Sequence, residues 1–97
     1  MTEDRETRLK RLRMRSWRRG MKEMDLILGP WSDGPLADLS DADLDIYETI
    51  LSENDQDLYL WLTARVSGRD DRGPAALAPM LDPIADFAAA RLAPANR

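Results

Sequence analysis

The chain has 97 residues, of which 43% are hydrophobic and 33% charged, and this balance predicts one folded domain with a single modest core. It contains neither histidine nor cysteine, which excludes the usual general base, the thiolate nucleophile and zinc sites built from imidazole or thiolate. Glycine-rich phosphate loops and calcium-loop spacings are also missing, so we expect no catalytic residues and no metal site, and hence not an enzyme.

The first predicted helix covers about residues 4 to 17 and is strongly basic. Leu9, Leu12 and Trp17 recur at near-helical spacing, with arginines between them. The net charge of −4 is unevenly divided: residues 1 to 23 carry +5, whereas residues 24 to 97 carry −9.

This basic helix permits several interpretations. Its cations could bind nucleic acid phosphates or an acidic protein partner, or they could form a solvated helix face. Because the acidic remainder of the chain would repel a polyanion, nucleic-acid binding is the less favoured alternative. The cations are Arg8, Lys10, Arg11, Arg13, Arg15, Arg18 and Arg19.

A second helix is predicted over about residues 20 to 29, separated from the first by Gly20. Its apolar residues Met21, Met24, Leu28 and Trp31 have the spacing of one helix face. Gly-Pro pairs at 29–30 and 34–35 favour turns, so we expect a loop over residues 29 to 38.

The third helix has the clearest start. Ser40 is placed to cap it, Asp43 stands at the third helical position, and Leu39 and Leu44 can form a hydrophobic staple. We expect its buried face to contain Leu44, Tyr47, Ile50 and Leu51.

A fourth, short helix is predicted over about residues 55 to 65, capped by Asn54 or Asp55. Its inward residues should be Leu58, Trp61 and Leu62, with Tyr59 at the rim.

The last third of the chain is rich in proline and alanine. Residues 67 to 73 form a predicted loop, and Pro74 suits the first turn of a fifth helix. Pro79 and Pro83 each remove an amide donor, so we expect this helix to break, with a second piece starting at Pro83, and residues 93 to 97 to fray. The predicted buried face consists of Leu77, Leu81, Ile84, Ala88 and Leu92.

No segment shows the alternation of a β-strand, and no internal repeat or sustained heptad is present. We therefore predict an all-α fold, a compact bundle of about five helices forming a single domain over residues 1–97.

The segment from Trp17 to Asp25 concentrates apolar, basic, glycine and acidic residues at a predicted helix junction. Gly20 could let the backbone turn sharply, or let the backbone of a partner approach closely. A purely structural interpretation is also available, in which Gly20 breaks the helix and Arg19 pairs with Glu23 four residues later. Spacing alone favours the structural interpretation.

The sequence Arg-Gly-Met-Lys-Glu-Met-Asp at residues 19–25, with an aromatic residue at Trp31, resembles the signature of the succinate dehydrogenase assembly factor 2 family, the bacterial flavinators. Residues 51–62 look like the acidic cap and apolar, Trp-containing helix of the same family. The resemblance covers about residues 8 to 63. Trp31 stands where the family commonly has phenylalanine, and the stretch after residue 65 matches nothing distinctive.

This resemblance implies a five-helix protein that binds the flavoprotein subunit of succinate dehydrogenase or fumarate reductase and promotes covalent attachment of FAD to a histidine of that subunit. It places Arg19, Gly20 and Glu23 at the centre of the partner-binding surface. Further candidates for this surface are Arg18, Asp25 and Trp17.

The resemblance also implies that the flavin linkage forms on the partner, because this chain has no histidine. The factor would act by holding the partner in a reactive geometry, with no cofactor stably bound to itself. The alternatives are a small nucleic-acid-binding module and a generic protein-interaction domain.

Location is predicted from missing signals. No stretch reaches the roughly 18 apolar residues that span a bilayer, and the arginine-rich start lacks the apolar region of a secretory signal. Glu3, Asp4 and Glu6 argue against an organelle transit peptide. We therefore expect a cytoplasmic monomer without membrane insertion.

Overall fold

The computed structural model describes residues 3–69 and 73–92, with Leu92 described by its backbone alone. Within these ranges the regular structure is entirely helical, which confirms the predicted all-α class. The α-helices are α1 (Arg5–Trp17), α2 (Lys22–Asp33), α3 (Asp41–Leu51), α4 (Asp55–Ser67) and α5 (Ala78–Leu92). Two short 3-10 helices, η1 (Pro35–Asp38) and η2 (Ala75–Leu77), precede α3 and α5. The predicted fraying of residues 93 to 97 lies outside the described residues.

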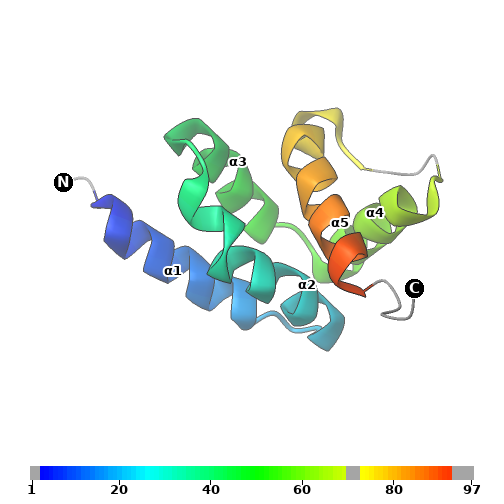
Figure 1. Ribbon diagram of the computed structural model, residues 1–97, viewed down its shortest axis with the longest axis horizontal. Helices are drawn as coiled ribbons and strands as arrows, with labels where there is room; N and C mark the ends of the chain where they lie inside the picture. Colours follow the sequence, from blue (N-terminus) through cyan, green and yellow to red (C-terminus); the bar gives the residue numbers. More distant parts are fainter. Residues whose placement is uncertain (1–2, 70–72, 93–97) are drawn as a thin grey trace.

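The helices form two packed pairs joined through α2. α1 packs mainly against α2, and α4 mainly against α5, while α2 also contacts α4 and α5. Figure 1 shows α1 at one end of the long axis and α4 at the other, with α3 above α1. None of the helices in the described part of the chain is long and apolar enough to cross a membrane.

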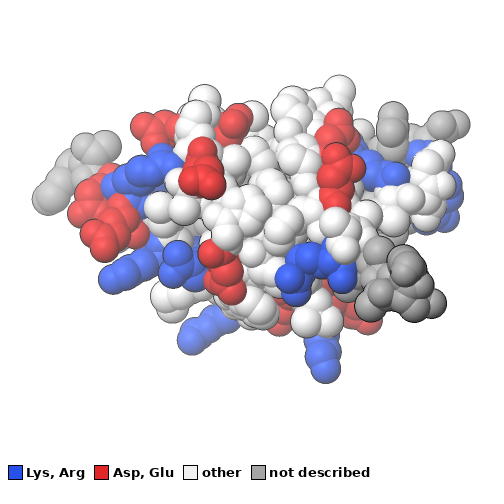
Figure 2. All heavy atoms as spheres, in the orientation of Figure 1, with Lys and Arg blue, Asp and Glu red and all other residues white. Residues whose placement is uncertain are grey.

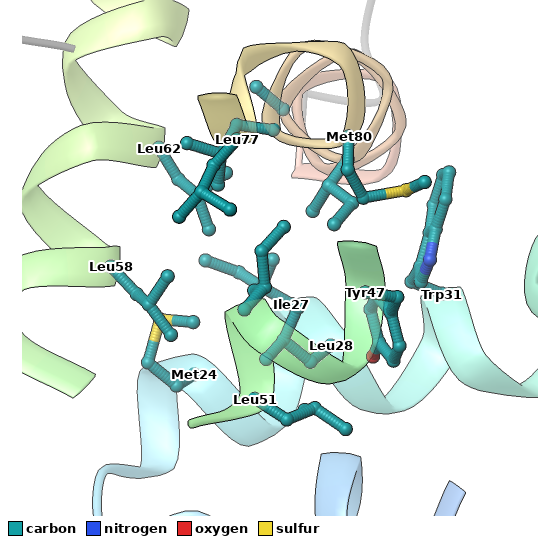
Figure 3. Packing of buried hydrophobic residues seen from close by; sticks show 14 of the residues in the cluster. Met24, Ile27, Leu28, Trp31, Tyr47, Leu51, Leu58, Leu62, Leu77 and Met80 are labelled. Atoms are coloured by element: carbon teal, nitrogen blue, oxygen red, sulfur yellow. The ribbon is translucent and has the colours of Figure 1, made fainter. Parts of the chain in front are cut away.

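A single core joins both pairs, and its side chains come from every helix. Figure 3 shows the α2 side chains Met24, Ile27 and Leu28 beneath Leu62 of α4 and Met80 of α5. The face predicted for the third helix is buried, with Tyr47 fully covered. Trp61 is half-buried at the edge of the core.

The ends of the middle helices follow local capping chemistry. Ser40 Oγ accepts a hydrogen bond from the Asp43 amide at 3.1 Å, as predicted. Asn54, and not Asp55, caps α4, because its Oδ1 accepts from the amides of residues 56 and 57 at 2.8 and 3.2 Å. α4 extends to Ser67, two residues beyond its predicted end, and Gly68 caps it in the left-handed conformation with φ of 75°.

The loop predicted over residues 29 to 38 is wrong in its first half, because α2 continues through Pro30 to Asp33. Pro30 removes one amide donor. Continuing the helix, however, places Trp31 in the core with 4% of its surface exposed, against the ring of Phe87 at a centroid distance of 5.6 Å. Burial of this large side chain outweighs the local cost of the proline.

The predicted break at Pro83 is also wrong. Pro74 precedes η2, and α5 then runs without interruption from Ala78 through Pro83. Leu81 and Ile84, on either side of Pro83, are both fully buried, so an unbroken helix keeps both in the core. The predicted face is buried at residues 77, 81, 84 and 88, while the side chain of Leu92 lies outside the described residues.

Candidate partner-binding surface

Residues 18–21 join α1 to α2, and we call this segment the junction. Two carboxylates that follow it in the chain, one near and one distant, accept hydrogen bonds from its backbone. The Arg19 amide donates to Asp25 Oδ1 at 2.7 Å, and the Gly20 amide donates to Asp55 Oδ2 at 2.9 Å. The junction is therefore anchored both to α2 and to the start of α4.

The Arg19 side chain points into the protein, with 9% of its surface exposed. Its Nε donates to Asp55 Oδ1 at 2.6 Å, and its two Nη atoms donate to the carbonyls of Leu51 and Glu53 at 2.6 and 3.0 Å. Arg19 thus pairs with Asp55, and the structural interpretation that paired it with Glu23 is wrong. Its guanidinium closes the turn between α3 and α4 and supplies donors to carbonyls at the end of α3.

Gly20 is exposed and does not have a positive φ. A Cβ atom added there would meet only Asp55 Oδ2, at an ordinary van der Waals distance of 3.7 Å. The fold of this chain therefore does not require glycine at this position. A backbone conformation that favours glycine is therefore not the reason for Gly20, and the surface of this residue is open.

Arg18 and Glu23 are exposed charges on either side of Gly20 in the sequence. Glu23 lies in the first turn of α2, and Arg18 follows the last residue of α1. Within the described part of the chain, neither side chain forms a hydrogen bond or an ion pair. Both charges therefore remain available to a partner.

Asp25 and Trp17 contribute to the internal packing of the site. The Asp25 carboxylate accepts a hydrogen bond from the Arg19 amide. The Trp17 ring lies directly on Gly29, and its Nε1 donates to Asp33 at 3.1 Å, yet 40% of the residue stays exposed. Asp25 therefore shapes the junction, while Trp17 adds exposed aromatic surface next to it.

Two open hollows border the Arg19–Asp55 ion pair. One, of about 270 Å³, is lined by Met14, Arg15, Arg18, Arg19 and Leu51. The other, of about 400 Å³, is lined by Gly20, Met21, Asn54, Asp55 and Gln56.

Sequence reasoning missed the contribution of the α3–α4 turn to this site. The sequence indicates Asp55 only as a possible helix cap, as an alternative to Asn54. Either Asn54 or Asp55 can cap α4, and the helix needs only one capping side chain. The other side chain is therefore free for another role. The adjacent pair Asn54-Asp55 was therefore the available signal.

The arginines of α1 are largely engaged by acids of α3. Arg5 pairs with Asp41 at 2.9 Å, Arg8 with Asp45 at 2.6 Å, and Arg11 with Glu48 at 2.8 Å. The hydrogen bond from Arg11 holds the pKa of the Glu48 carboxyl below its ordinary value. Figure 2 shows the resulting mixture of basic and acidic side chains at the end of the molecule where α1 begins.

These ion pairs weaken the alternative of nucleic-acid binding. A guanidinium whose charge is already compensated by a neighbouring carboxylate attracts a phosphate less strongly. The basic face predicted from the sequence is therefore a set of contacts between α1 and α3 over much of its length.

Comparison with protein families gives a match along most of the chain. The family model described as the flavinator of succinate dehydrogenase matches residues 10–88. This match extends well past residue 65, where the sequence by itself showed nothing distinctive, and it includes most of α5.

Among individual proteins, the chain is 44% identical over 61 residues to a mitochondrial succinate dehydrogenase assembly factor 2 from Meyerozyma guilliermondii, covering 63% of this chain and 45% of the relative. It is 39% identical over 64 residues to the protein of the same name from Mycosarcoma maydis, covering 66% of this chain and 27% of the relative. The chain thus spans less than half the length of these fungal relatives.

A bacterial relative is matched over more of its length. The chain is 37% identical over 65 residues to the FAD assembly factor SdhE of Pseudomonas putida, which covers 67% of this chain and 76% of that protein.

Proposed function

This chain belongs to the family of flavinators of succinate dehydrogenase, and we propose that it binds the flavoprotein subunit of succinate dehydrogenase or fumarate reductase and promotes covalent attachment of FAD to it. The names of the similar proteins, succinate dehydrogenase assembly factor 2 and FAD assembly factor, support this proposal. We refer to the flavoprotein subunit as the client.

The observation that carries the proposal is the surface around Gly20. A glycine that the fold does not require is exposed there, between Arg18 and Glu23, two charges without partners in the described part of the chain. An exposed glycine lets a second backbone approach closely, and the flanking charges can fix the orientation of that backbone. Arg19 and Asp25 contribute by shaping this surface from within.

We propose that the client itself forms the covalent bond to the flavin. The chain has no histidine to receive the flavin and no cysteine. The factor instead raises the fraction of client molecules in which the flavin and the accepting histidine are correctly oriented. In this proposal the factor binds no FAD of its own. Its cytoplasmic location and monomeric state stay predictions.

Co-expression with a succinate dehydrogenase flavoprotein subunit tests this function. We expect the flavin that stays attached to the client after denaturation to rise in the presence of the factor. Gly20→Arg should abolish the rise while leaving the helical circular dichroism spectrum unchanged, because a Cβ at this exposed position meets only Asp55 Oδ2, at an ordinary contact distance. Equal covalent flavin with and without the factor would contradict the proposal.

A matched control is available at Ala42, which is exposed next to Asp41, the residue that pairs with Arg5 at the start of α1. Ala42→Arg adds the same side chain in the first turn of α3, beside the end of α1 that is remote from the junction. It should leave the flavin yield at the wild-type level.

A further inference from the structure

Asp55 binds both Arg19 and Gly20, the first two residues of the Arg-Gly-Met-Lys-Glu-Met-Asp sequence. Its Oδ1 accepts from Arg19 Nε at 2.6 Å, and its Oδ2 accepts from the Gly20 amide at 2.9 Å. One carboxylate thus binds a side chain and the adjacent backbone at the same time. Its side chain is 19% exposed, so this arrangement is partly shielded from water.

The other two guanidinium nitrogens of Arg19 also donate within the protein and not toward a client. Two of its guanidinium nitrogens bind the carbonyls of Leu51 and Glu53, and the side chain is 9% exposed. A guanidinium has five N–H donors in a fixed plane, and three of its nitrogens here are committed to the protein itself. Arg19 therefore has little surface with which to contact a client directly.

We propose that Asp55 is a positioning residue for client binding, which holds Arg19 and the Gly20 amide in one conformation and so presents Gly20 and Glu23 to the flavoprotein subunit. This inference rests on the proposed function. Arg19, paired with Asp55, then helps to position the same surface from inside the protein. A loop held in its bound conformation before binding loses less conformational entropy when the complex forms.

Asp55→Asn separates the two contacts of this carboxylate. An amide side chain has one acceptor oxygen, so it can accept from Arg19 Nε or from the Gly20 amide, but it presents a donor to the other. The junction then loses one of its two anchors. In the free factor, we expect hydrogen exchange of the Gly20 amide to accelerate by about tenfold, because that amide opens more often.

Asp57→Asn is the matched control. Asp57 lies in the same first turn of α4, is exposed, and makes no side-chain contact with the described residues of the junction. The substitution removes the same charge from the same helix end. It should leave both the Gly20 exchange rate and client affinity unchanged.

The affinity test uses purified full-length factor and purified client lacking covalent flavin. We expect Asp55→Asn to bind about tenfold more weakly than wild type, and excess variant to restore the full flavinylation rate. Thermal unfolding followed by circular dichroism gives the folded fraction at the assay temperature. The measured Kd is multiplied by that fraction, so loss of folded protein is not mistaken for loss of positioning.

The outcomes separate the two proposals. If wild-type factor does not bind the client, the proposed function is wrong and the inference falls with it. If wild type binds and Asp55→Asn binds equally well after correction, only the inference is wrong. An equal loss in Asp57→Asn would show a general effect of charge and would also overturn it.

Discussion

Gly20 precedes α2 and Gly29 lies within it, and the two glycines have opposite surroundings. A Cβ added to Gly20 would meet one atom at 3.7 Å, whereas at Gly29 it would lie 2.5 Å from Cδ2 and Cε2 of the Trp17 ring. Gly29 is therefore required for packing of α1 on α2, and Gly20 is free to serve a partner.

Alanine substitutions should separate these two roles. Gly29→Ala forces the Trp17 ring from its place and should lower the free energy of unfolding by about 1–3 kcal/mol. Gly20→Ala should change it by about 1 kcal/mol or less while weakening client binding. Urea unfolding and client titration measure the two quantities. A large loss of stability in Gly20→Ala would refute the assignment of Gly20 to a partner surface.

A buried pair of hydroxyls links α1 to α3. Ser16 Oγ donates to the Leu12 carbonyl at 2.8 Å and lies 2.6 Å from Tyr47 Oη. Because the single hydroxyl proton of Ser16 is committed to Leu12, Tyr47 must donate to Ser16. Both residues are fully buried, so this bond has no competing water.

Burial raises the pKa of the Tyr47 hydroxyl above its ordinary value. Stability from this group is therefore complete below the unfolded pKa of about 10, and is lost as the pH rises above it. Tyr47→Phe should lower the free energy of unfolding by about 0.5–1.5 kcal/mol at neutral pH. The variant should also lose less of that free energy than wild type as the pH rises into the alkaline range. Urea unfolding at a series of pH values measures this. Identical alkaline slopes in both proteins would show that another group titrates.

At the scale of elements, α1 and α3 are held together largely by ion pairs. Glu48 accepts from Arg8 and Arg11 at 3.1 and 2.8 Å, and it has 33% of its side chain exposed. Such a partly solvated network contributes modestly, and salt screens it. It nevertheless contributes to the position of the basic helix against α3, because the apolar contribution of α1 to the fully buried core is small.

Glu48→Gln tests this network. Hydrogen bonding from Arg11, followed by that from Arg8, lowers the pKa of Glu48, so its stabilising effect is present above its ordinary value of 4.5 and is lost as the pH falls below it. We expect the variant to lose about 1 kcal/mol at neutral pH and low salt, with a smaller difference at acid pH.

The same difference should shrink at about 1 M salt, where the screening length falls to roughly 3 Å. Asp86→Asn provides the comparison, because Asp86 is exposed on α5 without a partner among the described residues. That variant should stay within about 0.5 kcal/mol of wild type. A difference for Glu48→Gln that is independent of salt would argue for packing instead of charge.

For the whole molecule, the uneven charge along the sequence is largely balanced in space. The basic N-terminal segment lies against acids of α3, and the chain has a net charge of −4. A nucleic acid would meet arginines that are largely paired with acids, and a net repulsive field.

We therefore expect no binding to a fluorescent DNA duplex at about 0.15 M salt, measured by anisotropy. Weak binding that appears at low salt should vanish as the salt concentration rises. Saturable binding at physiological salt would contradict the expectation and revive the nucleic-acid alternative.

The sequence by itself determined the features that depend on near neighbours. Helix faces follow a period of 3.6 residues, and caps act over two or three residues, so the buried face of α3 and the cap at Ser40 were predictable. The family signature at residues 19–25 was likewise contiguous. These interactions leave a local pattern because both partners lie within one or two helical turns.

Only the tertiary structure decided the features that join distant segments. Asp55 pairs with Arg19 across 36 positions of sequence, and no local pattern marks such a pair. α2 and α5 continue through Pro30 and Pro83 because burial of Trp31, Leu81 and Ile84 in a shared core outweighs the lost amide bonds. Local propensity sets the cost of each proline, and only the packed fold supplies the compensating burial.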